Sequence, residues 1–155
     1  MAQANMLAYV RKLHVEPLLG KDVQVLAHMP CLGYLSLQAK TVPEESIIIC
    51  SNAFQVLKQF DFSYKLSCLT FEPGAMPRLK KLRISYDSRG PGSEHEEVSP
   101  VAGVEHLESL EEVNVALYAK RGEGSRLESL CREFIQRHQR CESMNINVRY
   151  REDDD

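Results

Sequence analysis

Apolar residues along this chain recur with one spacing, and its clearest example is Leu79-x-x-Leu82-x-Ile84. In an extended chain, residues two apart point to the same side, so Leu82 and Ile84 would face a common core. Lys81 and Arg83 would then point to the opposite side. Leu79 lies three residues earlier, where a turn of the chain could bring it under the same core. The pattern predicts a half-buried strand that follows a turn.

The same spacing is found along most of the chain. It occurs as Leu32-x-x-Leu35-x-Leu37, Leu57-x-x-Phe60-x-Phe62, Leu110-x-x-Val113-x-Val115 and, less regularly, Val10-x-x-Leu13-x-Val15, while Met144-x-Ile146-x-Val148 keeps only the strand part. The middle positions are 13, 35, 60, 82, 113 and 144, so the steps between them are 22, 25, 22, 31 and 31 residues. Leucine-rich repeats have a period of about 20 to 29 residues, and three of the steps lie within it.

One such unit cannot bury its own apolar edge, whereas stacked units form a parallel sheet with a continuous core behind it. The pattern therefore predicts an α/β leucine-rich-repeat solenoid, a horseshoe with its parallel sheet on the concave face. We expect about five to six irregular repeats, with a helix and a strand as the C-terminal cap. The alternative is an ordinary α/β domain whose strands happen to share this spacing.

Several segments between these strands have patterns of their own. Residues 21–30 have helical spacing and end at a proline, which favours a short helix or 3₁₀ turn. Residues 47–49 are apolar and predict a short extra strand on the convex side. Residues 66–71 repeat the leucine spacing only nine positions after Leu57, which favours either a hairpin or a second convex-side strand.

The last third of the chain accounts for the two long steps. Residues 87–100 are polar and rich in Gly and Pro, which predicts a mobile loop. A helix is expected over 125–140, starting with a capping box in which Ser125 and Glu128 satisfy free backbone N–H groups. We expect a single leucine-rich-repeat domain over 1–150 and a disordered acidic tail over 151–155.

Composition narrows the class of protein. A chain of 155 residues with 43% hydrophobic residues suits one domain, and its net charge of -3 gives no electrostatic basis for nucleic-acid binding. No apolar run approaches the roughly 20 residues needed to span a membrane. The 5 cysteines are scattered and odd in number, which favours reduced, buried thiols in the cytoplasm or nucleus over a disulfide framework.

The sequence offers no catalytic motif, so we expect no enzymatic activity and no cofactor. Phosphate-binding, nucleophile-elbow and zinc-protease motifs are absent from it. Cys131, His138 and Cys141 are the one local group with metal-ligating residue types, but Cys131 lies on the apolar stripe of the predicted helix. We therefore expect no metal site. Glu111 and Glu112 are neighbours on a predicted strand and would point to opposite faces, which excludes an acid–base pair.

What remains is the face of the predicted sheet that points away from the core. Solenoids use such surfaces to bind proteins. Its candidate binding residues are Tyr34, Ser36, Gln38, Gln59, Asp61, Ser63, Lys81, Arg83, Ser85, Glu112, Asn114, Asn145, Asn147 and Arg149. Each of them could instead be a solvated strand residue, and Lys81 and Arg83 could pair internally with Glu112.

Several runs resemble a known family. The segments 26–37, 54–60, 69–82 and 103–113 are similar to the leucine-rich repeats of plant intracellular immune receptors of the nucleotide-binding leucine-rich-repeat class. The run Gly74-Ala75-Met76-Pro77 resembles most specifically the last repeats of coiled-coil receptors from grasses. The likeness covers about residues 7–150.

This resemblance implies a cytoplasmic or nuclear recognition module. In that family the corresponding region lies at the C-terminal end of a longer chain, helps to hold the receptor inactive and recognises pathogen effectors or guarded host proteins. The implied partners are therefore an effector, a guarded protein or the nucleotide-binding domain of the same receptor. The alternative is a truncated receptor remnant or stand-alone scaffold without a switching role, whose first repeat has no cap and whose edge around Val10 to Val15 would favour aggregation.

Overall fold

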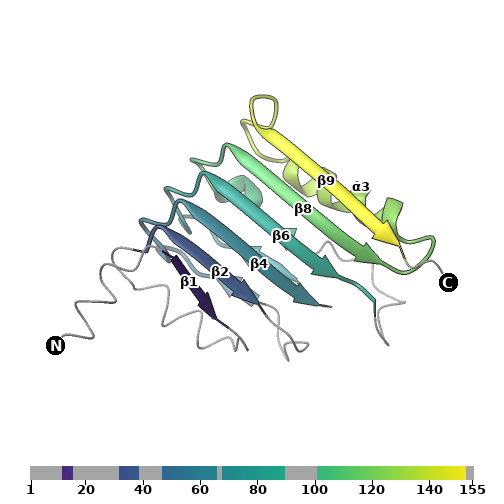
Figure 1. Ribbon diagram of the computed structural model, residues 1–155. Helices are drawn as coiled ribbons and strands as arrows, with labels where there is room; N and C mark the ends of the chain where they lie inside the picture. The colour runs from purple at the N-terminus through teal and green to yellow at the C-terminus, as the bar shows by residue number, and fades with distance from the viewer. Residues whose placement is uncertain (1–11, 16–31, 39–46, 66–67, 90–100, 153–155) are drawn as a thin grey trace.

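Six parallel strands form the main sheet of the protein, as the computed structural model shows (Figure 1). The structure describes residues 12–15, 32–38, 47–65, 68–89 and 101–152, and everything below concerns these residues. In spatial order the strands are β1 (Lys12–Val15), β2 (Tyr34–Gln38), β4 (Gln59–Lys65), β6 (Lys81–Asp87), β8 (Glu112–Ala119) and β9 (Asn145–Glu152). Each strand pairs in parallel with the next, which confirms the predicted parallel sheet.

The strand register follows the apolar pattern except at the last strand. One line of directly paired residues runs Leu13, Leu35, Phe60, Leu82, Val113 and Ile146. The first five are the middle positions of the predicted repeats. The prediction of Met144 as the sixth was wrong, because the partner of Val113 is Ile146 and the final step is 33 residues. Met144 is nevertheless buried just before β9 starts.

A second, three-stranded parallel sheet lies behind the main one. It consists of β3 (Ile47–Ile49), β5 (Leu69–Phe71) and β7 (Val101–Ala102), and a 3₁₀ helix, η1 (Val104–His106), follows β7. The predicted extra strand over 47–49 is confirmed. The hairpin alternative for 66–71 is wrong, since β5 pairs in parallel with β3 and β7. The two-residue strand β7 carries no period that could have revealed it.

The chain turns from the second sheet into the main one in the same way each time. The N–H of Leu57 donates to the carbonyl of Phe54 at 3.3 Å, and the N–H of Leu79 donates to Met76 at 3.1 Å. Each of these tight turns carries its leucine under the sheet, where it is fully buried. This confirms that Leu79 lies under the same core as the strand that follows it.

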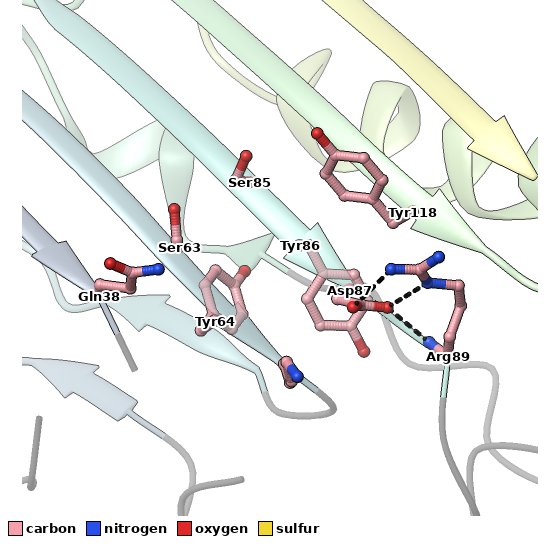
Figure 2. Close-up of a pocket in the computed structure, with 9 residues that line it drawn as sticks. Gln38, Ser63, Tyr64, Ser85, Tyr86, Asp87, Arg89 and Tyr118 are labelled. Atoms are coloured by element: carbon pink, nitrogen blue, oxygen red, sulfur yellow. Dashed lines mark hydrogen bonds and ion pairs between the residues drawn. The ribbon is translucent and has the colours of Figure 1, made fainter. Parts of the chain in front are cut away.

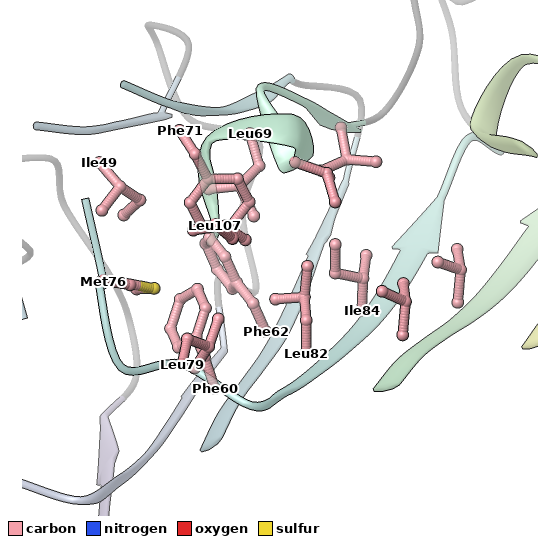
Figure 3. Close-up of a cluster of buried hydrophobic side chains, with 14 of the residues drawn as sticks. Ile49, Phe60, Phe62, Leu69, Phe71, Met76, Leu79, Leu82, Ile84 and Leu107 are labelled. Atoms are coloured by element: carbon pink, nitrogen blue, oxygen red, sulfur yellow. The ribbon is translucent and has the colours of Figure 1, made fainter. Parts of the chain in front are cut away.

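The core fills the space between the two sheets (Figure 3). Apolar side chains of the main sheet meet those of the second sheet, and fully burying one such side chain contributes about 1.5–3 kcal/mol. Aromatic rings form a continuous series through it, Phe54, Phe60, Phe62, Tyr64 and Tyr86, with successive ring centroids 6.3, 5.6, 4.9 and 5.2 Å apart.

The single α-helix of the described residues, α3 (Gly124–Ile135), packs behind β8 and β9 (Figure 1). It buries Leu127, Cys131 and Ile135, as the apolar stripe predicts. The helix ends at Ile135, earlier than the expected residue 140. Tighter turns follow, with the N–H of His138 donating to the carbonyl of Ile135 at 3.0 Å. The chain turns there because the His138 ring is buried and contacts the carbonyl of Leu107.

The start of α3 is also corrected by the structure. The predicted capping box does not form, because the helix begins at Gly124 and no side chain of its N-cap residue makes a capping hydrogen bond. Instead, Oε2 of Glu152 accepts a hydrogen bond from the backbone N–H of Gly124 at 2.8 Å. Arg151 and Glu152 therefore belong to β9 and not to an acidic tail.

Three segments with an expected structure lie wholly or partly outside the described residues. The helical turn over 21–30 lies outside the described residues, as do 90–100 of the expected loop and 153–155 of the tail. Asp87, expected in the loop, is the last residue of β6. In the part of the chain that the structure covers, no helix has the length and apolar character needed to cross a membrane.

Candidate protein-interaction surface

All fourteen candidate residues lie on the face of the main sheet that points away from the second sheet, here called the open face. Strand register arranges them in three rows across β2, β4, β6, β8 and β9. The rows are Tyr34, Gln59, Lys81, Glu112 and Asn145; Ser36, Asp61, Arg83, Asn114 and Asn147; and Gln38, Ser63, Ser85 and Arg149, with Ala116, which is not a candidate, completing the third row on β8. Every side chain in these rows is partly or fully exposed, so the alternation predicted from the sequence positions them correctly.

A fourth row was missed by the sequence reasoning. It contains Lys65, Asp87, Tyr118 and Arg151, which lie side by side at the carboxyl ends of β4, β6, β8 and β9. The signal was present, because each of them continues the two-residue alternation of its strand. Assigning position 87 to a loop and position 151 to a tail hid two of the four.

Asp61 is the centre of a polar cluster at the β2 side of the open face. The hydroxyl of Tyr34 donates to Oδ2 of Asp61, and Nε2 of Gln59 donates to Oδ1 at 3.4 Å. The hydrogen bond to Asp61 raises the pKa of Tyr34, and desolvation adds to this, while the nearby charge of Arg83 acts in the opposite direction. The carboxylate of Asp61 is thus occupied by partners within the protein.

Among the described residues, Lys81 and Arg83 form no ion pair with Glu112, contrary to the alternative considered for them. Glu112 is the register partner of Lys81, yet its Oε1 accepts a hydrogen bond from Nδ2 of Asn145 at 3.3 Å. Within the part of the chain that the structure describes, neither Lys81 nor Arg83 forms an ion pair, and both are exposed. Their charges are therefore available to a partner.

A pocket of about 460 Å³ lies where the open face meets the carboxyl ends of the strands (Figure 2). It is lined by Gln38, Ser63, Tyr64, Lys65, Ser85, Tyr86, Asp87, Arg89 and Tyr118. Arg89 forms one wall: its Nε and Nη2 lie 3.0 and 3.1 Å from the two carboxylate oxygens of Asp87, and its guanidinium carbon lies 5.6 Å from the centre of the Tyr118 ring.

The Asp87–Arg89 pair is held in its charged form. Desolvation by itself would raise the pKa of Asp87, but the side-chain and backbone hydrogen bonds from Arg89 outweigh it, so that the pKa is lowered. The nearby charge of Lys65 acts in the same direction. A bidentate arginine–carboxylate contact is geometrically rigid, so the pair fixes the shape of this pocket wall.

Two residues of the local group with metal-ligating residue types, Cys131 and His138, have structural surroundings. Nδ1 of His138 accepts a hydrogen bond from the N–H of Arg140 at 3.0 Å, so Nε2 carries the proton and donates to the carbonyl of Leu107 at 2.7 Å. Burial raises the pKa of Cys131 to about 12, which leaves its thiol protonated. The described residues contain no group of three or more His, Cys, Asp or Glu residues that could hold a metal ion.

The expectation of buried thiols is correct for one cysteine. Of the four cysteines that the structure describes, all free, Cys131 is buried, Cys68 and Cys141 are half-buried and Cys50 is exposed. Cys50 comes directly after Ile49, where the short strand β3 has ended and the chain turns outward.

Comparisons with known proteins agree with the fold and the resemblance. The chain matches the family described as "Leucine-rich repeat region" over residues 4–144. It is 34% identical to disease resistance protein RGA5 of Oryza sativa subsp. japonica over 136 residues, 85% of this chain and 12% of that protein. It is also 34% identical to disease resistance protein Pik-1 of the same species over 92 residues, 59% of this chain and 8% of that protein.

The chain thus spans only 12% or less of the length of these relatives. No solved structure matches it significantly. The expected likeness to disease resistance proteins of grasses is confirmed, and the parallel sheet with its repeated turns agrees with the matched family. The chain belongs to the leucine-rich repeat region family.

Proposed function

We propose that this chain is a non-enzymatic protein-recognition module of a plant immune receptor and that the open face is its binding surface. The observation that carries the proposal is the open face itself, a continuous set of polar and charged side chains across five parallel strands. Its similarity to disease resistance proteins supplies the biological setting.

The proposal includes the architecture of the whole chain. We infer a single domain over 1–150 that curves into a horseshoe of about five to six repeats, with the open face on its concave side. In this arrangement α3 and β9 form the C-terminal cap, because α3 covers the last two strands of the main sheet and Glu152 ties β9 to the helix start. Curvature would draw partner-facing side chains of different strands together.

The proposed partners are a pathogen effector, a guarded host protein or the nucleotide-binding domain of the receptor to which the module belongs. Contact with that last partner would hold the receptor inactive. All three are proteins of the cytoplasm or nucleus, which is where we place the module. Recognition needs no catalytic group, and the open face provides charged and amide side chains that suit protein contacts.

Charge reversal on the open face tests this proposal. Purified chain carrying Lys81→Glu and Arg83→Glu would be used to capture proteins from grass-cell extract, with captured proteins then purified and tested for direct binding. The matched control carries Arg78→Glu and Arg121→Glu, two exposed residues outside the strands, which change the net charge equally. We expect binding to be lost with the open-face variant and kept with the control. Equal loss with both would contradict the proposal.

The second candidate is a scaffold or receptor remnant that has no partner of its own. Among the described residues, β1 pairs only with β2, and an unpaired strand edge favours self-association. Sedimentation of the purified chain distinguishes the two. A monomer that unfolds cooperatively supports the recognition module, whereas aggregation that depends on concentration supports the remnant.

A further inference from the structure

The open face carries positive charge in a chain that is negative as a whole. Across β2, β4, β6, β8 and β9 it presents five cations, Lys65, Lys81, Arg83, Arg149 and Arg151, and three carboxylates, Asp61, Asp87 and Glu112. The formal charge of this face is therefore +2, which leaves -5 for the rest of a chain whose net charge is -3. The net charge of the open face is thus opposite in sign to that of the rest of the chain.

The carboxylates of the open face are satisfied within the protein. Asp61 accepts hydrogen bonds from Tyr34 and Gln59, as described above, Asp87 is held by Arg89 and Glu112 accepts from Asn145. Their capacity to attract a cationic partner is correspondingly reduced.

The cations differ in this respect. Within the part of the chain that the structure describes, none of the five has an ion pair or a side-chain hydrogen bond. All five are exposed. The unpaired charge of the face therefore belongs to positively charged donors, which favour an anionic partner.

Four of these cations flank one strand. Lys81 and Arg83 lie on β6, Arg149 and Arg151 lie on β9, and β8 runs between them. Neighbouring strands are about 4.8 Å apart, and residues two apart along a strand are separated by about 6.6–6.8 Å. On this face β8 presents Glu112 beside Lys81, and Oε1 of Glu112 already accepts a hydrogen bond from Asn145. Asn114 follows, in register with Arg83 and Asn147. Ala116 and Tyr118 then lie beside Arg149 and Arg151.

We propose that the open face binds an extended acidic segment of a partner protein, lying along β8 with carboxylates at alternate residues. Alternate side chains of an extended peptide repeat at the same distance as Lys81 and Arg83, so successive carboxylates could meet successive cations. The amide of Asn114 can both donate to and accept from a peptide backbone. This inference rests on the proposed function and adds the chemistry of the partner.

Nucleic acid fits the surface less well, although phosphates are also anionic. Binding of single-stranded nucleic acid relies on exposed aromatic side chains on which bases stack. On the described part of the open face, Tyr118 is the one exposed ring, and it already lies against Arg89, while Tyr34 is hydrogen-bonded to Asp61. Three carboxylates within the same rows also oppose a continuous phosphate backbone.

Fluorescence anisotropy with a labelled peptide of alternating Glu and Ser tests the inference. A peptide of the same composition with its Glu residues in one block tests the spacing, and an oligothymidylate of equal charge tests the nucleic-acid alternative. The proteins are the full chain, the pair Lys81→Glu with Arg83→Glu, the pair Arg149→Glu with Arg151→Glu, and the control pair Arg78→Glu with Arg121→Glu. Circular dichroism verifies that each variant is folded.

We expect the alternating peptide to bind more tightly than the block peptide and the oligothymidylate. Each open-face pair of substitutions should weaken the affinity for the alternating peptide about tenfold or more, while the control pair should change that affinity by no more than about twofold. Added salt should weaken binding because exposed charges are screened. The inference is overturned if the alternating peptide does not bind, if the control pair weakens its binding as much as the open-face pairs do, or if the oligothymidylate binds more tightly than the alternating peptide. If the peptide fails while captured proteins still depend on Lys81 and Arg83, the proposed function stands and the acidic chemistry does not.

Discussion

Replacing Gly103 with alanine tests how tightly the second sheet is packed. Gly103 lies between β7 and η1 with φ of +83°, in the left-handed region that disfavours residues with a side chain. A Cβ at this position would lie 2.1 Å from the backbone oxygen and 2.9 Å from the backbone nitrogen of Phe71 in β5. Backbone atoms inside a sheet cannot move aside as a flexible side chain could.

The expected destabilisation has two parts. The left-handed conformation costs about 1–2 kcal/mol for alanine, and overpacking against β5 adds about 1–3 kcal/mol. We therefore expect Gly103→Ala to lower the free energy of unfolding by about 3 kcal/mol. In a chain of this size, that corresponds to a fall in Tm of about 6–12 °C.

Gly122 provides the matched control. It has nearly the same backbone angle, φ of +87°, but a Cβ there would meet nothing within 4 Å. Gly122→Ala should therefore show the conformational part alone, about 1–2 kcal/mol. Urea unfolding followed by far-ultraviolet circular dichroism measures both variants. Equal destabilisation by the two substitutions would refute the close contact between Gly103 and β5.

Two further predictions concern ionisation and helix capping. Desolvation raises the pKa of Tyr86 to about 12 and that of Tyr64 well above its usual value. Both pKa values are higher in the folded than in the unfolded state, so the stability that depends on them should be full below pH of about 10 and fall as the pH rises towards 12. Spectrophotometric titration of the folded chain measures the tyrosine pKa values. If all tyrosines ionised together near pH of about 10, the raised pKa values would be contradicted. Glu152→Gln weakens the side-chain acceptor at the start of α3, and Glu152→Ala removes it. The alanine variant should therefore lower the free energy of unfolding, measured in urea, by about 1 kcal/mol. Ser125→Ala should lower it much less, because Ser125 makes no capping hydrogen bond. A larger loss of stability for Ser125→Ala than for Glu152→Ala would show that the capping box forms after all and would contradict the cap by Glu152.

The main sheet could be predicted because its two physical requirements are local. Each strand needs alternating apolar residues for its buried side, and each turn needs a leucine three residues before the strand position that it supports. These distances are short enough to be read directly, as Leu79 and Leu82 illustrate. The residues of the open face could be predicted from the same alternation, since the polar residues between the apolar ones must point the other way.

The remaining features depend on contacts between distant segments. Glu152 caps a helix that starts 28 residues earlier, and no local pattern indicates that a strand end will reach it. His138 ends the same helix by turning inward to Leu107, 31 residues away. The pocket likewise forms from four strand ends, and Arg89 joins it through Asp87 and Tyr118. Such contacts become visible only once the strands are stacked.

Site-specific photo-crosslinking tests most directly whether the open face is where a partner binds. Benzoylphenylalanine would replace Asn147, exposed on the open face, or Ser129, exposed on α3, and each protein would be irradiated in grass-cell extract. The account predicts that a partner protein crosslinks at position 147 and not at position 129. Crosslinking of that partner at position 129 alone would show that recognition uses the helix side and would contradict the account.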